Sequence, residues 1–294
     1  MTSVRAATVP AMVSENDEVA ALRTLLDELL AYTANVPDEA KTPRGKRFEV
    51  VRIKAVVTLA LHTHRLGQAV ATLLDAGFGI EVGPTVRSVL EHGLTAQWLL
   101  QYGDEASYGF AAEAQRQRRS TAETLRKLVQ IQVLKADDAD AVLALIAEDM
   151  THEIEKTSAS PGGRNFYARC QDFAYGDAYY FTYRVLSDFV HPGFTICEAY
   201  VESHDPLTFQ TEPRALSDPK TWLYNTCCGL LWAARAVDML DRAHPNREFL
   251  RRAARQLGVP LELRLSGAAT VTRGQDRAKR TKARRESRAA DPSA

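Results

Sequence analysis

Two side chains suited to phosphate chemistry, Arg184 and His191, lie seven residues apart in a stretch with helical periodicity. At 3.6 residues per turn, this spacing brings both onto nearly the same face, about 10 Å apart along the axis. Histidine exchanges protons near neutral pH, and arginine stays charged and grips phosphate oxygens. Metal-free RNA cleavage needs an acid, a base and a cation at the phosphorus. The pair therefore predicts phosphodiester chemistry, or else a helix cap plus an ion pair from Arg184 to Asp188.

The helix that must carry this pair is predicted over residues 178–191. Its polar stripe consists of Tyr180, Arg184, Ser187 and His191. The opposite face, expected to pack into the core, consists of Ala178, Phe181, Val185 and Phe189. Pro192 and Gly193 end the helix directly after the stripe. We interpret Arg184 and His191 as catalytic with Ser187 in support, while Tyr180 and Tyr183 either stack on substrate bases or belong to the core.

A second pair of charges, Arg87 and Glu91, interrupts a helix predicted over residues 84–102 that is apolar on nearly all sides. A guanidinium and a carboxylate in such a helix need partners. Arginine before glutamate is the less favourable order for an intrahelical pair, so partners on another helix are expected. We interpret Glu91 as a catalytic residue that orients the His191 imidazole, and Arg87 as substrate-binding. The alternative is a buried ion pair that sets helix register.

The spacing Arg184-x6-His191 resembles the Arg-x4-6-His signature of HEPN domains. These are all-helical modules that often act as metal-independent ribonucleases in toxin and phage-defence systems. The resemblance implies a composite site built by paired helices of a homodimer acting on RNA phosphodiesters. Active members often have a polar residue after the arginine, where this chain has Val185. The sequence shows no cluster of metal ligands, and no cofactor is expected.

A second likeness extends over residues 48–243. The motifs Arg87-Ser88-Val89-Leu90-Glu91 and Tyr183-x3-Ser187-x3-His191 are similar to those of a bacterial domain-of-unknown-function family, number 5677. That family has no established reaction. The likeness implies that Arg87, Glu91, Ser187 and His191 belong to one structural or functional cluster.

The whole chain predicts one all-α domain over residues 14–263, a bundle of about seven to nine helices. Of its 294 residues, 45% are hydrophobic and 25% charged, as in ordinary globular proteins. Sustained period-2 alternation, a Gly-rich phosphate loop and a membrane-length apolar run are all missing from the sequence. Four cysteines without framework spacing, and no signal peptide, indicate a reduced, cytoplasmic protein that does not enter a membrane.

Both ends of the chain are predicted to be disordered. Residues 1–13 lack a helical pattern, and residues 264–294 carry nine Lys/Arg against three Asp/Glu. Dense charge and few aliphatic side chains predict a basic tail that is dispensable for folding. This tail is either a solvated terminus or an arm for nucleic acid or an acidic partner.

Two functions fit these patterns. The first, our working hypothesis, is a HEPN-like metal-independent endoribonuclease of a toxin or phage-defence type, active as a homodimer on RNA. The second is a non-catalytic helical scaffold whose polar stripe mediates dimerisation or partner binding. A His191 buried away from solvent would favour the scaffold.

Overall fold

The computed structural model describes residues 15–33, 50–149, 165–214, 218–241 and 243–290. The disorder predicted for residues 1–13 lies outside this range. Within it the chain forms eleven α-helices and one short hairpin, which confirms the all-α prediction; nine of the helices have seven or more residues. The elements are α1 (Glu15–Thr33), α2 (Val50–Asp75), α3 (Gly83–Tyr102), α4 (Asp104–Gln130), α5 (Ala136–Asp149), α6 (Phe166–Gln171), α7 (Gly176–Ser187), α8 (Phe194–Ala199), β1 (Val201–His204), β2 (Leu207–Phe209), α9 (Pro219–Asp238), α10 (Arg247–Leu257) and α11 (Gly267–Ala290).

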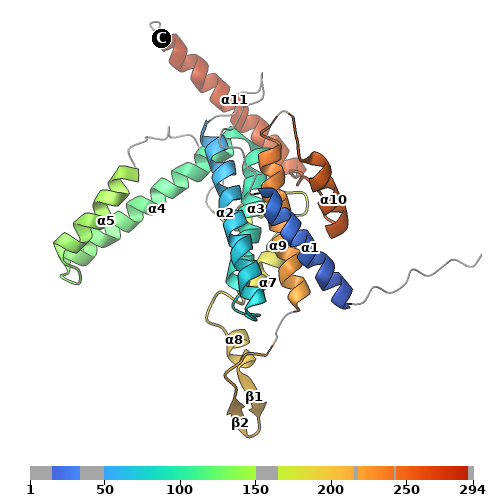
Figure 1. Ribbon diagram of the computed structural model, residues 1–294. Helices are drawn as coiled ribbons and strands as arrows, with labels where there is room; N and C mark the ends of the chain where they lie inside the picture. The colour runs from blue at the N-terminus through green and yellow to red at the C-terminus, as the bar shows by residue number, and fades with distance from the viewer. Residues whose placement is uncertain (1–14, 34–49, 150–164, 215–217, 242, 291–294) are drawn as a thin grey trace, which may run out of the picture.

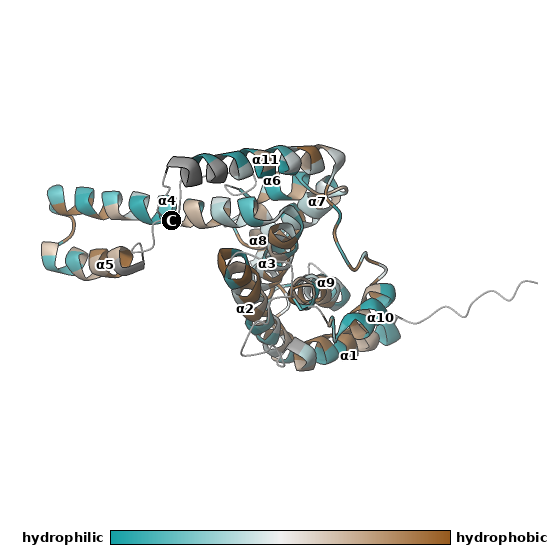
Figure 2. Cartoon of the chain, turned by 90° about the horizontal axis from the view of Figure 1, so that it is seen from above, coloured by the Kyte–Doolittle hydropathy of each residue, from teal (hydrophilic) through white to brown (hydrophobic). Residues whose placement is uncertain are grey.

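Helix α3 lies at the centre of the bundle, as its apolar sequence predicts. It packs against α2 and α9, while α1 and α10 pack on α9 (Figures 1 and 2). Pro84 occupies the first turn of α3, where a missing backbone N–H removes no helical hydrogen bond. Trp98, Leu94 and Leu99 are almost fully buried. None of the helices described is both long and apolar enough to cross a membrane.

Helices α3 and α9 approach so closely that only glycine fits where they cross. A Cβ added to Gly93 would overlap the carbonyl oxygen of Gly229 and lie 2.8 Å from its Cα. A Cβ added to Gly229 would lie 2.7 Å from the carbonyl oxygen of Val89. Because the opposing atoms belong to the backbone, no side-chain rotation can relieve such an overlap.

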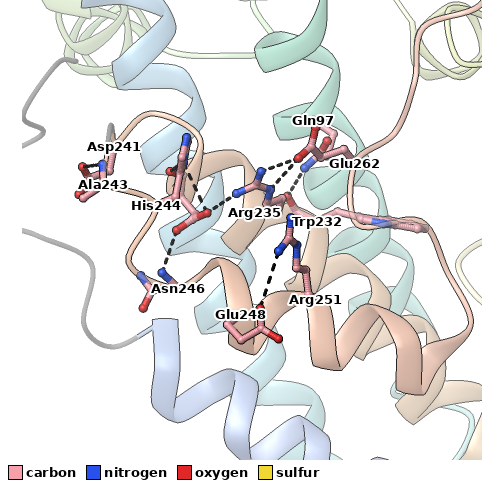
Figure 3. A network of polar contacts seen from close by, with 11 residues as sticks. Gln97, Trp232, Arg235, Asp241, Ala243, His244, Asn246, Glu248, Arg251 and Glu262 are labelled. Atoms are coloured by element: carbon pink, nitrogen blue, oxygen red, sulfur yellow. Dashed lines mark hydrogen bonds and ion pairs between the residues drawn. The ribbon is translucent and has the colours of Figure 1, made fainter. Parts of the chain in front are cut away.

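A buried polar network holds the C-terminal end of α9 (Figure 3). Arg235, 2% exposed, pairs with Asp238 on its own helix and with Glu262 further along the chain. The Asp238 carboxylate also accepts from the backbone amide of Asn246 at 3.1 Å. The backbone carbonyl oxygen of Asp238 lies 2.8 Å from Nδ1 of His244. A buried charge stabilises a fold only when it is paired and hydrogen-bonded. This network satisfies that condition and ties the segments on both sides of α10 to α9.

The C-terminal segment is a helix where the sequence predicts disorder. Helix α11 contacts α3 and α4 at its beginning and then projects from the bundle (Figure 1). Ala269 is buried, and the Tyr102 hydroxyl donates to the Asp276 carboxylate at 3.0 Å. The prediction of a disordered tail was therefore wrong for residues 267–290. Arginine, lysine and alanine are strong helix formers, and composition does not reveal the few contacts that dock such a helix.

We expect Tyr102→Phe to lower the free energy of unfolding by about 1 kcal/mol, because it removes the hydrogen bond that anchors α11. Urea unfolding followed by circular dichroism measures the difference. Tyr175→Phe is the control, since Tyr175 is 71% exposed, and it should leave stability unchanged. Equal stability of both variants would mean that this bond does not hold α11.

The irregular pattern after residue 193 corresponds to α8 and a small antiparallel hairpin. Strands β1 and β2 pair Ser203 with Thr208 and His204 with Leu207. The hairpin projects from the end of the bundle opposite α11 (Figure 1). It is short enough that the all-α class stands.

Candidate functional site

Helix α7 ends at Ser187, so His191 follows the helix instead of forming its last turn. Turns occupy residues 188–190, whose backbone amides bond to carbonyl oxygens three residues back, and the His191 amide bonds to the Ser187 carbonyl oxygen at 3.4 Å. Pro192 disfavours helical geometry at His191 and has no amide proton to bond to the Asp188 carbonyl oxygen, so the helix cannot continue beyond these turns. The Ser187 hydroxyl donates to the Tyr183 carbonyl oxygen at 2.7 Å. Ser187 therefore stabilises the end of α7.

Helix α7 also buries a different face from the one predicted. The residues facing the bundle are Tyr179, Tyr183 and Leu186. Of the predicted core face, Phe181 is 68% exposed, Val185 is 43% exposed and Ala178 is exposed as well. Only Phe189 packs inward, with its ring 5.0 Å from that of Trp222. We call the exposed group Ala178, Phe181 and Val185 the outer face of α7.

The physical reason for this orientation lies in the tyrosines. Tyr179 packs edge-on against Trp232 at 5.6 Å, and Tyr183 packs against Phe166 at 4.4 Å between ring centroids. Both tyrosine rings meet aromatic partners in the bundle, and the Tyr183 hydroxyl also accepts a hydrogen bond there from Arg87. Helical periodicity distinguishes the two faces but does not decide which of them docks.

The polar stripe borders the outer face. Because successive residues are 100° apart, Arg184 lies about 60° around the helix from Phe181. Arg184 and His191 are both exposed, and neither side chain forms a hydrogen bond or ion pair with any residue described. The alternative pair from Arg184 to Asp188 is thus not formed in this part of the chain, and no bond joins Glu91 to His191.

Arg87 connects α3 to α7. One of its terminal nitrogens donates to the Tyr183 hydroxyl, and its guanidinium lies 4.4 Å from the centroid of that ring. Its pair with Glu91 is long, at 3.9 Å, and its Nε is buried without a hydrogen-bond partner in the described residues. The expectation of a partner on another helix is confirmed. Two predicted substrate-binding residues, Arg87 and Tyr183, therefore contact each other.

The third predicted substrate-binding residue, Tyr180, belongs to a short aromatic row. Its ring stacks on Tyr183 with centroids 5.9 Å apart, and it forms a T-shaped pair with Tyr167, whose centroid lies 4.7 Å away. Tyr167, on α6, is 50% exposed and was not singled out from the sequence. Partly exposed rings in a row can stack on nucleic-acid bases.

Glu91 borders a pocket of about 200 Å³ that the sequence does not reveal. Helices α2, α3, α4 and α6 supply its walls. The residues that matter for its chemistry are Glu91, His92, Thr95, Phe110, Glu113 and Arg169. Glu91 lines this pocket and pairs with Arg87 at 3.9 Å, so the pocket adjoins the contact between Arg87 and Tyr183.

A partly buried arginine, Arg169, lines this pocket. Arg169 donates to the Thr95 hydroxyl at 2.9 Å, and its guanidinium lies 5.3 Å from the centroid of Phe110. Burial lowers the pKa of Arg169, while the nearby Glu91 carboxylate acts in the opposite direction. An arginine remains charged in spite of such a shift. The pocket therefore contains a cation, carboxylates and an aromatic wall.

His92 is an uncharged member of the pocket. Burial lowers its pKa, against the opposing effect of the Ser88 carbonyl oxygen 2.6 Å from Nδ1. A carbonyl oxygen only accepts, so Nδ1 carries the proton and Nε2 keeps its lone pair. The His62 ring lies at a steep angle to this ring, with 5.0 Å between the two centroids.

The lowered pKa of His92 predicts a loss of stability in mild acid. The unfolded chain protonates His92 near pH 6.5, and the folded chain does so only at lower pH. The contribution of His92 to the free energy of unfolding is therefore fully present above pH 6.5. It is lost as the pH falls towards the pKa of His92 in the folded chain. We expect His92→Asn to reduce the difference in unfolding free energy between about pH 7.5 and about pH 5.5. Urea unfolding at both values measures it, and an unchanged difference would contradict the assignment.

Sequence reasoning missed Arg169, Glu113, Thr95 and Phe110. They come from three helices, and their sequence spacing carries no motif. The adjacent pair Glu91-His92 is a weak metal signal in the sequence, and the described residues hold no group of three or more histidine, cysteine or acidic side chains placed to bind a metal. A usable signal was Arg169 itself, a charge inside the short helix that Asn165 caps by accepting from the Ala168 amide at 2.7 Å.

Comparison with models of known protein families identifies a family for this chain. A family model described as "Family of unknown function (DUF5677)" matches residues 54–207, more than half of the chain. The matched segment includes Arg87, Glu91, Ser187 and His191. Searches of curated proteins and of solved structures found no significant match.

Proposed function

The chain belongs to the DUF5677 family of unknown function, and we propose that it is a HEPN-like, metal-independent endoribonuclease that acts as a homodimer. The observation that carries the proposal is the exposure of Arg184 and His191 at the end of α7. Both side chains are free of partners among the described residues and lie beside an apolar surface. A histidine and an arginine serving only as cap and ion pair would be engaged instead.

These two residue types suffice for transesterification of RNA. A neutral His191 imidazole takes the proton of the ribose 2′-hydroxyl as that oxygen attacks phosphorus. The bond from phosphorus to the 5′-oxygen breaks, and the protonated His191 of the second copy donates a proton to that oxygen. Arg184 binds the phosphate oxygens and stabilises their extra charge in the transition state. The products are a 2′,3′-cyclic phosphate and a 5′-hydroxyl.

The remaining predicted site residues act around this centre. Arg87, which α3 presents at its contact with α7, is a second cation for the RNA backbone. Tyr180, in its row with Tyr167, offers a ring for base stacking. Ser187 supports the end of α7 through the Tyr183 carbonyl oxygen. Glu91 acts near Arg87 and the pocket, and not on the His191 imidazole.

The outer face of α7 supports the homodimer. Phe181 and Val185 expose apolar area to water in one copy, and burying such area is favourable by about 25 cal/mol per Å². Because Arg184 borders this face, two α7 helices packed across it bring two sets of Arg184 and His191 to one seam. The polar stripe of a single copy supplies one imidazole, that of His191, whereas the reaction has two proton transfers.

The test of the activity uses the purified full-length protein and a single-stranded RNA in excess chelator. We expect internal cleavage with 2′,3′-cyclic phosphate and 5′-hydroxyl ends, identified by mass spectrometry. No cleavage above a mock purification, a requirement for added divalent metal, or 5′-phosphate ends would each contradict the proposal. A stable dimer without activity would favour the helical scaffold.

The dimer has its own prediction. We expect Phe181→Asp to give a monomer and to reduce RNA cleavage at least tenfold, since a charge on the outer face opposes its burial. Light scattering after size-exclusion chromatography measures the mass. Phe209→Asp is the matched control, because Phe209 is 69% exposed on the hairpin and Phe181 is 68% exposed. A monomeric wild type, or an active Phe181→Asp monomer, would contradict the composite site.

A further inference from the structure

We infer that the pocket bordered by Glu91 binds a guanine base of the RNA next to the cleaved phosphate. This inference rests on the proposed function, which makes RNA the substrate. It adds a base preference and assigns roles to Glu91, His92 and Arg169, which the cleavage chemistry does not use.

The size of the pocket limits the ligand. Its volume of about 200 Å³ is somewhat larger than the roughly 150 Å³ of an apolar cavity that admits benzene. A flat ring system the size of a nucleobase fits this range, and a whole nucleotide does not. Leu59 and Phe110 provide apolar surface for the faces of such a ring.

The polar groups of the pocket match the edge of guanine. Guanine presents two adjacent donors, N1–H and the N2 amino group, which suit the two oxygens of the Glu91 carboxylate. Its acceptors, O6 and N7, suit the guanidinium of Arg169. Adenine and cytosine present a ring acceptor beside the amino group, and uracil presents one N–H between two carbonyl groups. Those three bases would place an acceptor against the carboxylate.

The electrostatic state of the pocket favours the same ligand. Among the described residues Glu91 has one ion pair, a long one of 3.9 Å to Arg87, so its carboxylate can meet a ligand without losing a short contact to them. The protonated Nδ1 of His92 is directed to the Ser88 carbonyl oxygen, which leaves Nε2 as a further acceptor for an amino group. A ligand rich in adjacent N–H donors satisfies both groups.

The location agrees with a role in substrate selection. Glu91 lies four residues along α3 from Arg87, which is about one helical turn or about 6 Å along the axis. Arg87 in turn contacts Tyr183 of α7, the helix that carries Arg184. A base held in the pocket therefore lies beside the cation proposed for the RNA backbone. A preference for one base on one side of the cleaved bond follows.

Isothermal titration calorimetry with the four nucleoside 3′-monophosphates, in chelator, tests the inference. We expect wild-type protein to bind the guanosine nucleotide at least tenfold more tightly than the other three. Glu91→Gln replaces one acceptor oxygen with a donor. It should weaken the binding of the guanosine nucleotide at least tenfold. Glu123→Gln, on the exposed side of α4, is the matched control and should bind like the wild type.

Two further results complete the test. Equal binding of all four nucleotides, a preference for another base, or unchanged binding by Glu91→Gln would each overturn the guanine pocket. The wild-type ranking does not depend on the folding of any variant. Sequencing of RNA products gives a second readout, with cuts expected next to guanosine. Guanine binding without RNA cleavage supports the pocket and contradicts the nuclease, whereas cleavage without base preference or nucleotide binding contradicts the pocket alone.

Discussion

Replacing His191 with alanine is expected to slow RNA cleavage by roughly 10²–10⁴-fold, the usual value of a positioned proton-transfer group. The melting temperature should stay the same, because the side chain is exposed and makes no hydrogen bond or ion pair with a described residue. In a composite site both copies lose their imidazole at once. Initial rates with a fluorogenic RNA in excess chelator, alongside thermal melts, measure both quantities.

The matched control for His191→Ala is His204→Ala. His204 has a side chain that is 68% exposed, and it pairs with Glu198 near the hairpin, away from α7. Its removal should leave the rate of cleavage unchanged. If wild type and His191→Ala cleave at the same background rate, the nuclease proposal fails. If His191→Ala instead costs about 1–2 kcal/mol of stability with no activity to lose, His191 is a structural cap.

The largest expected loss of stability follows from Gly93→Ala. The added methyl group would overlap the backbone of Gly229 where α3 and α9 cross, so the two central helices must separate. Overpacking that side chains cannot relieve costs roughly 3 kcal/mol or more, which exceeds the gain of about 1 kcal/mol in helix propensity. Urea unfolding followed by circular dichroism and tryptophan fluorescence measures the change.

Gly274→Ala provides the matched control for the helix crossing. Gly274 lies within α11, and nothing lies within 4 Å of an added Cβ there. The same substitution should leave the unfolding free energy unchanged or raise it slightly, by the propensity gain alone. If Gly93→Ala were as stable as Gly274→Ala, the backbone contact between α3 and α9 would be disproved.

Most of the helices could be predicted because their signals are local. Apolar periodicity and the Gly-Pro start predict a helix over residues 84–102, and the structure has α3 at Gly83–Tyr102. Asp218 and Pro219 likewise mark the start of α9, where the Asp218 carboxylate accepts from the Lys220 amide at 2.9 Å. Caps and periodicity act within one or two turns of chain. A single sequence therefore contains them in full.

The candidate site was predictable only in part. The polar stripe and the charges Arg87 and Glu91 follow from residue types and spacing. The contact of Arg87 with Tyr183 joins residues 96 positions apart, and the pocket around Arg169 needs four helices at once. Neither spacing nor composition encodes such distances. Helix α11 was not predicted for the same reason, because the contact that anchors it joins Tyr102 and Asp276, which lie 174 positions apart.

The sequence by itself determined the helical class, the element that forms the centre, and the two residues that carry the proposed chemistry. Only the tertiary structure decided which face of α7 is buried. Both faces carry apolar side chains, so the choice depends on what each one meets. Tyr179 and Tyr183 find aromatic and guanidinium partners inside, and Phe181 and Val185 are left outside. Periodicity is a property of the helix alone, whereas burial is a property of the helix and its neighbours together.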